Sequence, residues 1–214
     1  VKIPSSVTRI GESAFYDCDD LNDVTIPGSV RTIEKDAFGC CGGLERVVLE
    51  EGVVELKESV FEACPLTEIT LPKSLRCVGI SSLGDFEIPT DEHGLQIRDG
   101  ILFSVPKPVK GHFVIPDGVR VIGSDVFTEC EELTQITIPQ SVVSISDNAF
   151  AGCSALKAVA LPEGLEYVGI QAFAGCSSLE SVELPKGVQY IGARAFGTYM
   201  TVTKHPDEYD TCEK

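Results

Sequence analysis

Residues 133–153 read LTQITIPQSVVSISDNAFAGC, and this stretch recurs along most of the chain with a period of about 23 residues. Its phenylalanine, Phe150, lies 23 residues from both Phe127 and Phe173. The same spacing relates the members of two phenylalanine series and two cysteine series: Phe15, Phe38, Phe61; Phe127, Phe150, Phe173, Phe196; Cys18, Cys41, Cys64; and Cys130, Cys153, Cys176. A fixed period of this length is the signature of a repeat architecture, in which each repeat forms one structural unit.

The letters of the repeat, L-x-x-V-x-I-P-x-x-V-x-x-I-x-x-x-A-F-x-x-C, predict its local structure. Ile136 and Ile138 alternate with polar residues, which is the pattern of a strand with one buried face. Pro139 then ends the strand because it has no N–H to donate. The small and large pair Ala149-Phe150 favours a tight helical turn against the interior. Since one repeat cannot bury its apolar side alone, we predict a right-handed, leucine-rich-repeat-like superhelix, mainly β with short helical turns, whose strands form a parallel sheet.

This architecture predicts which residues are buried. Eight repeats begin near Val1, Asn22, Glu45, Thr67, His112, Thr134, Lys157 and Glu180. Each should contribute one strand to the parallel sheet, and equivalent positions should stack along the axis. The residues expected to be buried in register are Val24, Val47, Ile69, Ile136, Val159 and Val182. The six repeat cysteines are expected to be buried and not joined in disulfides.

The repeats predict a single solenoid over residues 1–214, with repeats at 1–86 and 112–199, a hairpin insertion at 87–111 and a tail at 200–214. Within the insertion, apolar residues flank Asp99-Gly100, a pair that strongly favours a two-residue hairpin turn. Residues 95–97 should therefore pair with residues 101–103. The tail is expected to be a cap or a loose segment. Because Val1 falls inside a repeat and no signal peptide is visible, we expect this sequence to be a fragment of a longer chain.

Composition argues against two classes of partner. The chain has 33 acidic and 17 basic side chains, a formal net charge of −16. Such a surface repels phosphate backbones and anionic headgroups. No apolar run approaches the roughly 18 residues of a membrane span. We therefore expect neither nucleic-acid binding nor direct membrane insertion.

The residues that could carry chemistry follow the repeat and do not converge. Outside the six repeat positions, the cysteines are Cys40, Cys77 and Cys212. Adjacent residues such as Cys40 and Cys41 point apart, so zinc ligation is not expected. The histidines His93, His112 and His205 have no partner at catalytic or metal-binding spacing. We expect no catalytic residues, no cofactor and no metal site.

Two acidic clusters leave a calcium site open as an alternative. They occupy equivalent turns and comprise Asp17, Asp19, Asp20 and Asp23, and Glu129, Glu131 and Glu132. Calcium takes six or more oxygen ligands, but neither cluster has the spacing of a known calcium loop. A solvated acidic face is the preferred interpretation.

The polar positions of L-x-x-V-x-I should point to one exposed face, which we interpret as concave. The candidate binding residues on it are Asp23, Thr25, Arg46, Val48, Glu68, Thr70, His112, Gln135, Thr137, Ser181 and Glu183, and Val114, Ala158 and Ala160 occupy equivalent positions. They are small and mixed in character, without the aromatic cluster of a binding hot spot. Binding is expected through this face, through the insertion at 87–111, or through both, and an ordinary polar β face is the alternative to a binding face.

The I-P, A-F and C positions, at roughly 1–86 and 112–196, make the chain resemble the BspA-like leucine-rich repeat family. That family consists largely of surface proteins from mucosa-associated bacteria and protists, some of which have been assigned adhesion to host matrix proteins or cells. The resemblance implies an extracellular or cell-surface location and a non-catalytic module that binds a macromolecule, either a host matrix or cell-surface protein or a glycan. A purely structural spacer that presents another domain is the alternative.

Overall fold

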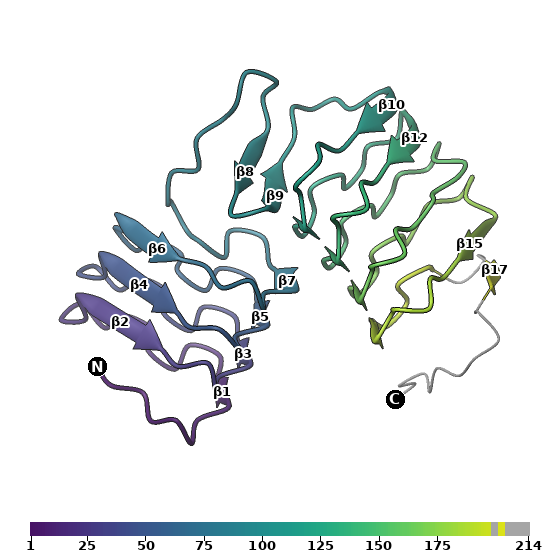
Figure 1. Ribbon diagram of the computed structural model, residues 1–214. Helices are drawn as coiled ribbons and strands as arrows, with labels where there is room; N and C mark the ends of the chain where they lie inside the picture. The colour runs from purple at the N-terminus through teal and green to yellow at the C-terminus, as the bar shows by residue number, and fades with distance from the viewer. Residues whose placement is uncertain (198–200, 204–214) are drawn as a thin grey trace. The chain divides into compact units, whose positions relative to one another are not determined.

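The computed structural model describes residues 1–197 and 201–203. The chain forms two compact units, Val1–Ile88 (unit 1) and Pro89–Lys214 (unit 2). Each unit is a stack of coils, and successive coils pair through parallel strands (Figure 1). The parallel β-solenoid predicted from the repeat is therefore present in both units. That the two units form one continuous solenoid stays a prediction.

Unit 1 has two parallel sheets, one for each apolar segment of the repeat. The L-x-x-V-x-I segments form the first-strand sheet, in the order β2-β4-β6, and the segments after proline form the second-strand sheet, in the order β1-β3-β5-β7. Val24, Val47 and Ile69 are register partners on successive coils, as predicted. The strands are β1 (Arg9–Ile10), β2 (Asp23–Ile26), β3 (Thr32–Ile33), β4 (Arg46–Leu49), β5 (Glu55–Leu56), β6 (Glu68–Thr70) and β7 (Cys77–Val78).

Unit 2 repeats this arrangement with a longer second-strand sheet. That sheet runs β16-β14-β13-β11-β9-β8, whereas the first strands form two separate pairs, β10-β12 and β15-β17. The strands are β8 (Gln96–Arg98), β9 (Ile101–Ser104), β10 (Gly111–Val114), β11 (Val121–Ile122), β12 (Leu133–Thr137), β13 (Ser144–Ile145), β14 (Tyr167–Val168), β15 (Ser181–Glu183), β16 (Tyr190–Ile191) and β17 (Thr201–Thr203).

The predicted hairpin in the insertion is confirmed. Strands β8 and β9 pair antiparallel across Asp99 and Gly100. Both turn residues have positive φ, 51° and 73°, as a two-residue turn that matches the twist of its strands requires. Because β9 also pairs parallel with β11, the hairpin extends the second-strand sheet.

The expectation of a first strand in every repeat is wrong for two repeats. The first repeat contributes an isolated bridge between Lys2 and Thr25, and residues 157–161 form no strand. Val159 is accordingly half-buried, although its equivalents Val24, Val47, Ile69, Ile136 and Val182 are at most 5% exposed. Two alanines flank Val159, and alanine is a poor strand former, which weakens the pairing of this segment.

The predicted helical turns take the form of consecutive hydrogen-bonded turns, and no described residue is helical. In the repeat of Phe150, the Ala151 N–H donates to the carbonyl of Asn148 at 2.9 Å. Asn148 has φ of 54°, in the left-handed region that a right-handed helix cannot accommodate. Asp36, Ser59 and Gln171 repeat this geometry at equivalent positions, so the turn before each Ala-Phe or Val-Phe pair stops a helix from forming.

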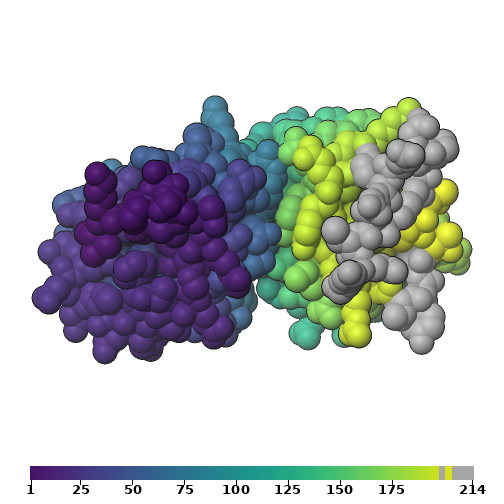
Figure 2. All heavy atoms as spheres, turned by 90° about the horizontal axis from the view of Figure 1, so that it is seen from below, coloured from purple at the N-terminus to yellow at the C-terminus, as the bar shows by residue number. Residues whose placement is uncertain are grey.

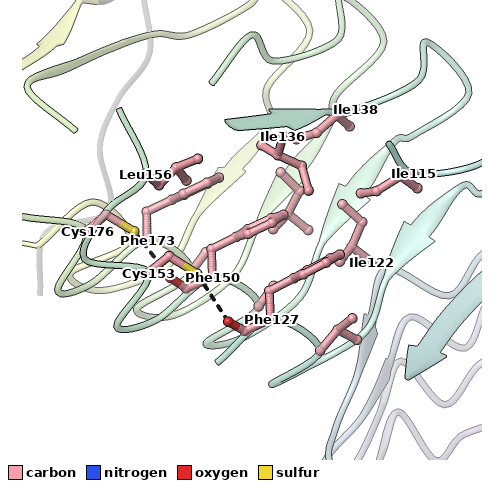
Figure 3. Packing of buried hydrophobic residues seen from close by; sticks show 14 of the residues in the cluster. Ile115, Ile122, Phe127, Ile136, Ile138, Phe150, Cys153, Leu156, Phe173 and Cys176 are labelled. Carbon is pink, nitrogen blue, oxygen red and sulfur yellow. Dashed lines mark hydrogen bonds between the residues drawn. The ribbon is translucent and has the colours of Figure 1, made fainter. Parts of the chain in front are cut away.

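The core of each unit is built from stacked equivalents. Phe127, Phe150 and Phe173 lie with ring centroids 4.9 and 5.0 Å apart and nearly parallel planes (Figure 3). In unit 1, Phe15 and Phe38 stack at 4.9 Å. Such offset contacts add to the free energy of burying the rings.

The repeat cysteines are free thiols, and five of the six are buried: Cys41, Cys64, Cys130, Cys153 and Cys176. The predicted burial of Cys18 is wrong, since its side chain is half-buried. It lies on the first coil of unit 1, where a neighbouring coil packs on one side. Residues 201–203 of the predicted tail pair with β15 and so extend the sheet. The rest of the tail that includes His205 and Cys212 lies outside the described residues.

Candidate binding surface

In unit 1 the predicted face is a small grid of exposed side chains. Asp23, Arg46 and Glu68 form one row in register, and Thr25, Val48 and Thr70 form the second. All six residues are exposed, while the residues between them point into the core. Six of the candidate residues are therefore brought together as the sequence predicts.

The grid combines a charged row with an apolar centre. Arg46 and Asp23 form an ion pair of 2.6 Å, and both side chains are more than half exposed. An exposed pair of this kind contributes only about 0–1 kcal/mol to stability, so its charges can be exchanged for those of a partner at little cost. Val48 is 40% exposed and lies between Thr25 and Thr70 in the second row. An apolar centre with a polar rim is the usual anatomy of a protein interface.

In unit 2 the same face is divided. His112 pairs in register with Gln135, and the His112 Nε2 lies 2.8 Å from the Thr137 hydroxyl. Ser181 and Glu183 pair in register with Thr201 and Thr203. Between these two pairs of strands, residues 157–161 interrupt the sheet. The curvature assigned to this face, concave, stays a prediction.

The interruption is associated with a groove that sequence reasoning missed. A cavity of about 470 Å³ is lined by Val159, Ala160, Leu161 and Glu163 of one coil and by Glu183, Leu184, Pro185 and Lys186 of the next. The signal in the sequence is the pair Ala158 and Ala160, at positions that the other repeats fill with polar residues or valine. Glu183 is the candidate site residue that borders this groove.

Two of the buried thiols, those of Cys64 and Cys130, are structural groups and not reactive ones. Burial raises the pKa of the Cys64 thiol to about 11 and also raises that of Cys130. At neutral pH Cys64 is therefore protonated, and its Sγ donates to the carbonyl of Phe38 at 3.0 Å. The thiolate, which is the nucleophile and the metal ligand, is disfavoured there.

The remaining candidate groups do not gather into a chemical site. Within residues 1–197 and 201–203, no three His, Cys, Asp or Glu side chains are arranged to hold a metal ion. The first acidic cluster borders an open hollow of about 660 Å³ at the end of unit 1, whose first coil is purple in Figure 2. One of its carboxylates, that of Asp19, accepts a hydrogen bond from the Gly42 N–H at 2.9 Å. The Cys40 Sγ lies 3.1 Å from the Tyr16 hydroxyl oxygen, and this contact raises the pKa of Tyr16.

Over the same described ranges, the structure contains no helix with the length and apolar character needed to cross a bilayer.

A family model described as BspA type leucine-rich repeat region matches residues 1–89 and 110–206 in six copies. These ranges leave out the hairpin between the two blocks of repeats, as the interruption of the 23-residue period predicts. The family resemblance seen in the sequence is thereby confirmed. No curated protein matches the chain.

Solved structures of leucine-rich repeat proteins are similar to this chain. A leucine-rich cell surface protein from Faecalibacterium prausnitzii A2-165 is 25% identical over 86% of this chain and 66% of its own, with a TM-score of 0.45. A leucine-rich repeat protein of T. pallidum is 27% identical over 91% and 80%, with a TM-score of 0.39. The pneumococcal vaccine antigen PcpA is 22% identical over 82% and 48%, with a TM-score of 0.48. The chain thus spans 66% of the length of the F. prausnitzii protein and 48% of the length of PcpA.

Proposed function

Because this chain belongs to the BspA-type leucine-rich repeat family, we propose that it is a non-catalytic module that binds a macromolecule at a cell surface or after secretion. The partner is a protein in preference to a glycan, and it is recognised through the exposed faces of the first-strand sheets. Members of this family are typically surface or secreted proteins, which supports the location.

The observation that carries this proposal is the grid of unit 1. Its two rows are held by the backbone register of β2, β4 and β6, so the side chains are positioned before any partner arrives. Preorganised side chains lose less conformational entropy on binding, and affinity rises accordingly. A face with both charges and an exposed Val48 suits a protein partner, whereas a sugar platform needs exposed aromatic rings.

The net charge of −16 favours a partner protein that carries basic patches. Basic patches on another protein would be attracted to this chain over a Debye length of about 8 Å at physiological ionic strength. Charge of this kind acts mainly on the association rate. Binding should therefore weaken as salt concentration rises, mostly through slower association.

The experiment that tests this function is a surface plasmon resonance screen of the chain against a panel of purified extracellular matrix proteins, cell-surface proteins and glycans. Saturable binding to a protein that weakens with salt supports the proposal. If no member of the panel binds, the alternative of a spacer that presents another domain replaces it.

A further inference from the structure

One coil of unit 2 leaves its backbone unpaired. In residues 157–161, the Lys157 N–H donates to the carbonyl of Thr134 at 3.2 Å, and pairing stops there. Ala158, Val159 and Ala160 make no backbone hydrogen bond to another described residue, either toward β12 or toward β15. Backbone N–H and C=O groups need partners, and here water or a ligand must supply them.

The side chains of this coil do not obstruct access to that backbone. Ala158 and Ala160 are exposed and carry single methyl groups. At the equivalent outward positions of unit 1 stand larger side chains, such as Arg46 and Val48, on a strand that is fully paired with both neighbours. Residues 157–161 therefore offer what β4 does not: an accessible strip of backbone in the middle of the first-strand face.

A groove lies beside this strip. Its cavity of about 470 Å³ falls within the range of about 300–1,000 Å³ that ligand-binding clefts occupy. Its lining is mixed: half-buried Val159 and Leu161 supply apolar surface, Glu163, Glu183 and Lys186 supply polar surface, and Leu184 and Pro185 lie buried beneath. Apolar surface from Val159 and Leu161 beside unpaired backbone matches the requirements of an extended peptide, which needs hydrogen-bond partners and somewhere to place alternate side chains.

The charged residues that line the groove favour a cationic peptide. Glu163 and Glu183 are exposed carboxylates from two successive coils that line the cavity, and Lys186 is the one cation among its lining residues. Two carboxylates against one ammonium favour a cationic ligand, as does the charge of the whole chain. A lysine or arginine side chain can lay its aliphatic stem along the apolar lining and bring its charged end to a carboxylate.

We propose that this groove binds an extended segment of a partner protein in which lysine or arginine alternates with small apolar residues. The segment pairs with the backbone of residues 158–160 and places a cationic side chain between Glu163 and Glu183. This site rests on the proposed function, because it names the chemistry of the partner that the module binds.

The test begins with two capped peptides as probes. One is acetyl-Val-Lys-Ala-Lys-Val-amide, and the other has glutamate in place of both lysines. Each is titrated into the isotopically labelled chain and followed by backbone amide NMR. The lysine peptide should saturably shift the amides of the non-proline residues within 157–163 and 183–186, and the glutamate peptide should bind at least about ten-fold more weakly, a difference of about 1.4 kcal/mol.

Two double variants test the two parts of the site. Glu163→Gln with Glu183→Gln should weaken the lysine peptide about ten-fold. Glu129→Gln with Glu131→Gln removes the same charge from a turn elsewhere in unit 2 and should leave its affinity unchanged. Ala158→Thr with Ala160→Thr supplies the β-branched residues that strands prefer. This variant should pair residues 157–161 with their neighbours, close the groove and abolish binding.

The outcomes separate this site from the proposed function. Shifts confined to other surfaces, or an equal response to both peptides, overturn the groove. The groove is also overturned if the whole chain binds a protein partner and the alanine-to-threonine variant binds it as tightly, although the module's binding function then stands. If the lysine peptide occupies the groove but the chain binds no protein in the screen, the site is supported and the proposed function fails.

Discussion

The Sγ of Cys153 donates a hydrogen bond to the carbonyl oxygen of Phe127, 3.1 Å away on the preceding coil (Figure 3). Cys176 makes the same bond to Phe150 at 3.2 Å, and Cys64 makes it to Phe38 in unit 1. The phenylalanine and cysteine positions of the repeat are thus linked: the thiols of Cys41, Cys64, Cys153 and Cys176 each donate to a phenylalanine carbonyl of the coil before. Cysteine suits this position because it is a small apolar side chain with a weak donor.

Replacing Cys153 by alanine should lower the free energy of unfolding by about 1–2 kcal/mol, because the Phe127 carbonyl loses a donor and a small void replaces the sulfur. The measurement is urea denaturation followed by circular dichroism. Cys18→Ala serves as the control, since Cys18 is half-buried, and it should cost clearly less. Equal losses at both positions would show that the hydrogen bond and burial contribute little.

The phenylalanine stack should be most sensitive at its centre. Phe150 is fully buried between two parallel rings, so Phe150→Ala should cost about 3–5 kcal/mol. Phe196 is 7% exposed and stacks on Phe173 at 5.6 Å, and Phe196→Ala should cost less. Thermal and urea unfolding of both variants give the comparison, and a larger loss at Phe196 would contradict it.

Alkaline pH should destabilise the fold through the buried thiols. Burial raises the pKa of Cys64 to about 11, whereas an unfolded cysteine titrates near about 8.5. The unfolded state therefore loses its proton first, and stability that is fully present below pH of about 8.5 falls as pH rises through about 11. Urea titrations over this window should show a flatter pH dependence for Cys64→Ala than for the parent chain. Identical slopes would refute the assignment.

Glu50 lies 23 residues after Pro27, at the position where the other repeats carry proline, and placing proline there should destabilise unit 1. The Glu50 N–H donates to the carbonyl of Ile26 at 3.0 Å, and proline cannot make this bond. Glu50→Pro should cost about 1–3 kcal/mol, even though changes toward a consensus more often stabilise a protein. Glu50→Ala keeps the N–H and should cost less than about 1 kcal/mol. A gain in melting temperature for Glu50→Pro would show that the bond is dispensable.

The period predicts the core well because each repeated apolar side chain packs against the same or a similar apolar residue on the neighbouring coils. Phe38, Phe150 and Val47 are buried where the pattern puts them. The second-strand sheet was not predicted as a sheet, since pairs such as Thr32–Ile33 and Ser144–Ile145 are too short to show an alternation. Its existence depends on register between coils, which a single repeat does not contain.

The repeat pattern does not predict the groove, which is associated with the interruption of the sheet at residues 157–161. Val159 matches the repeat perfectly, yet strand formation there depends on its flanking residues, Ala158 and Ala160, which the consensus treats as free positions. The exposed rows, by contrast, follow from alternation alone, as Asp23 and Thr25 illustrate. The identity of a partner is set by the chemistry of these exposed positions, which the repeat leaves unconstrained.

The most direct test of the binding function is the affinity of matched charge-reversal variants for a protein identified in the screen. Glu68→Lys with Glu183→Lys alters the strand faces, and Asp19→Lys with Glu131→Lys makes the same charge change on the turns. Surface plasmon resonance at physiological salt should show at least about a ten-fold loss of affinity, about 1.4 kcal/mol, for the strand-face variant and a much smaller loss for the turn variant. Equal affinities for both variants and the parent chain would contradict binding through the strand faces.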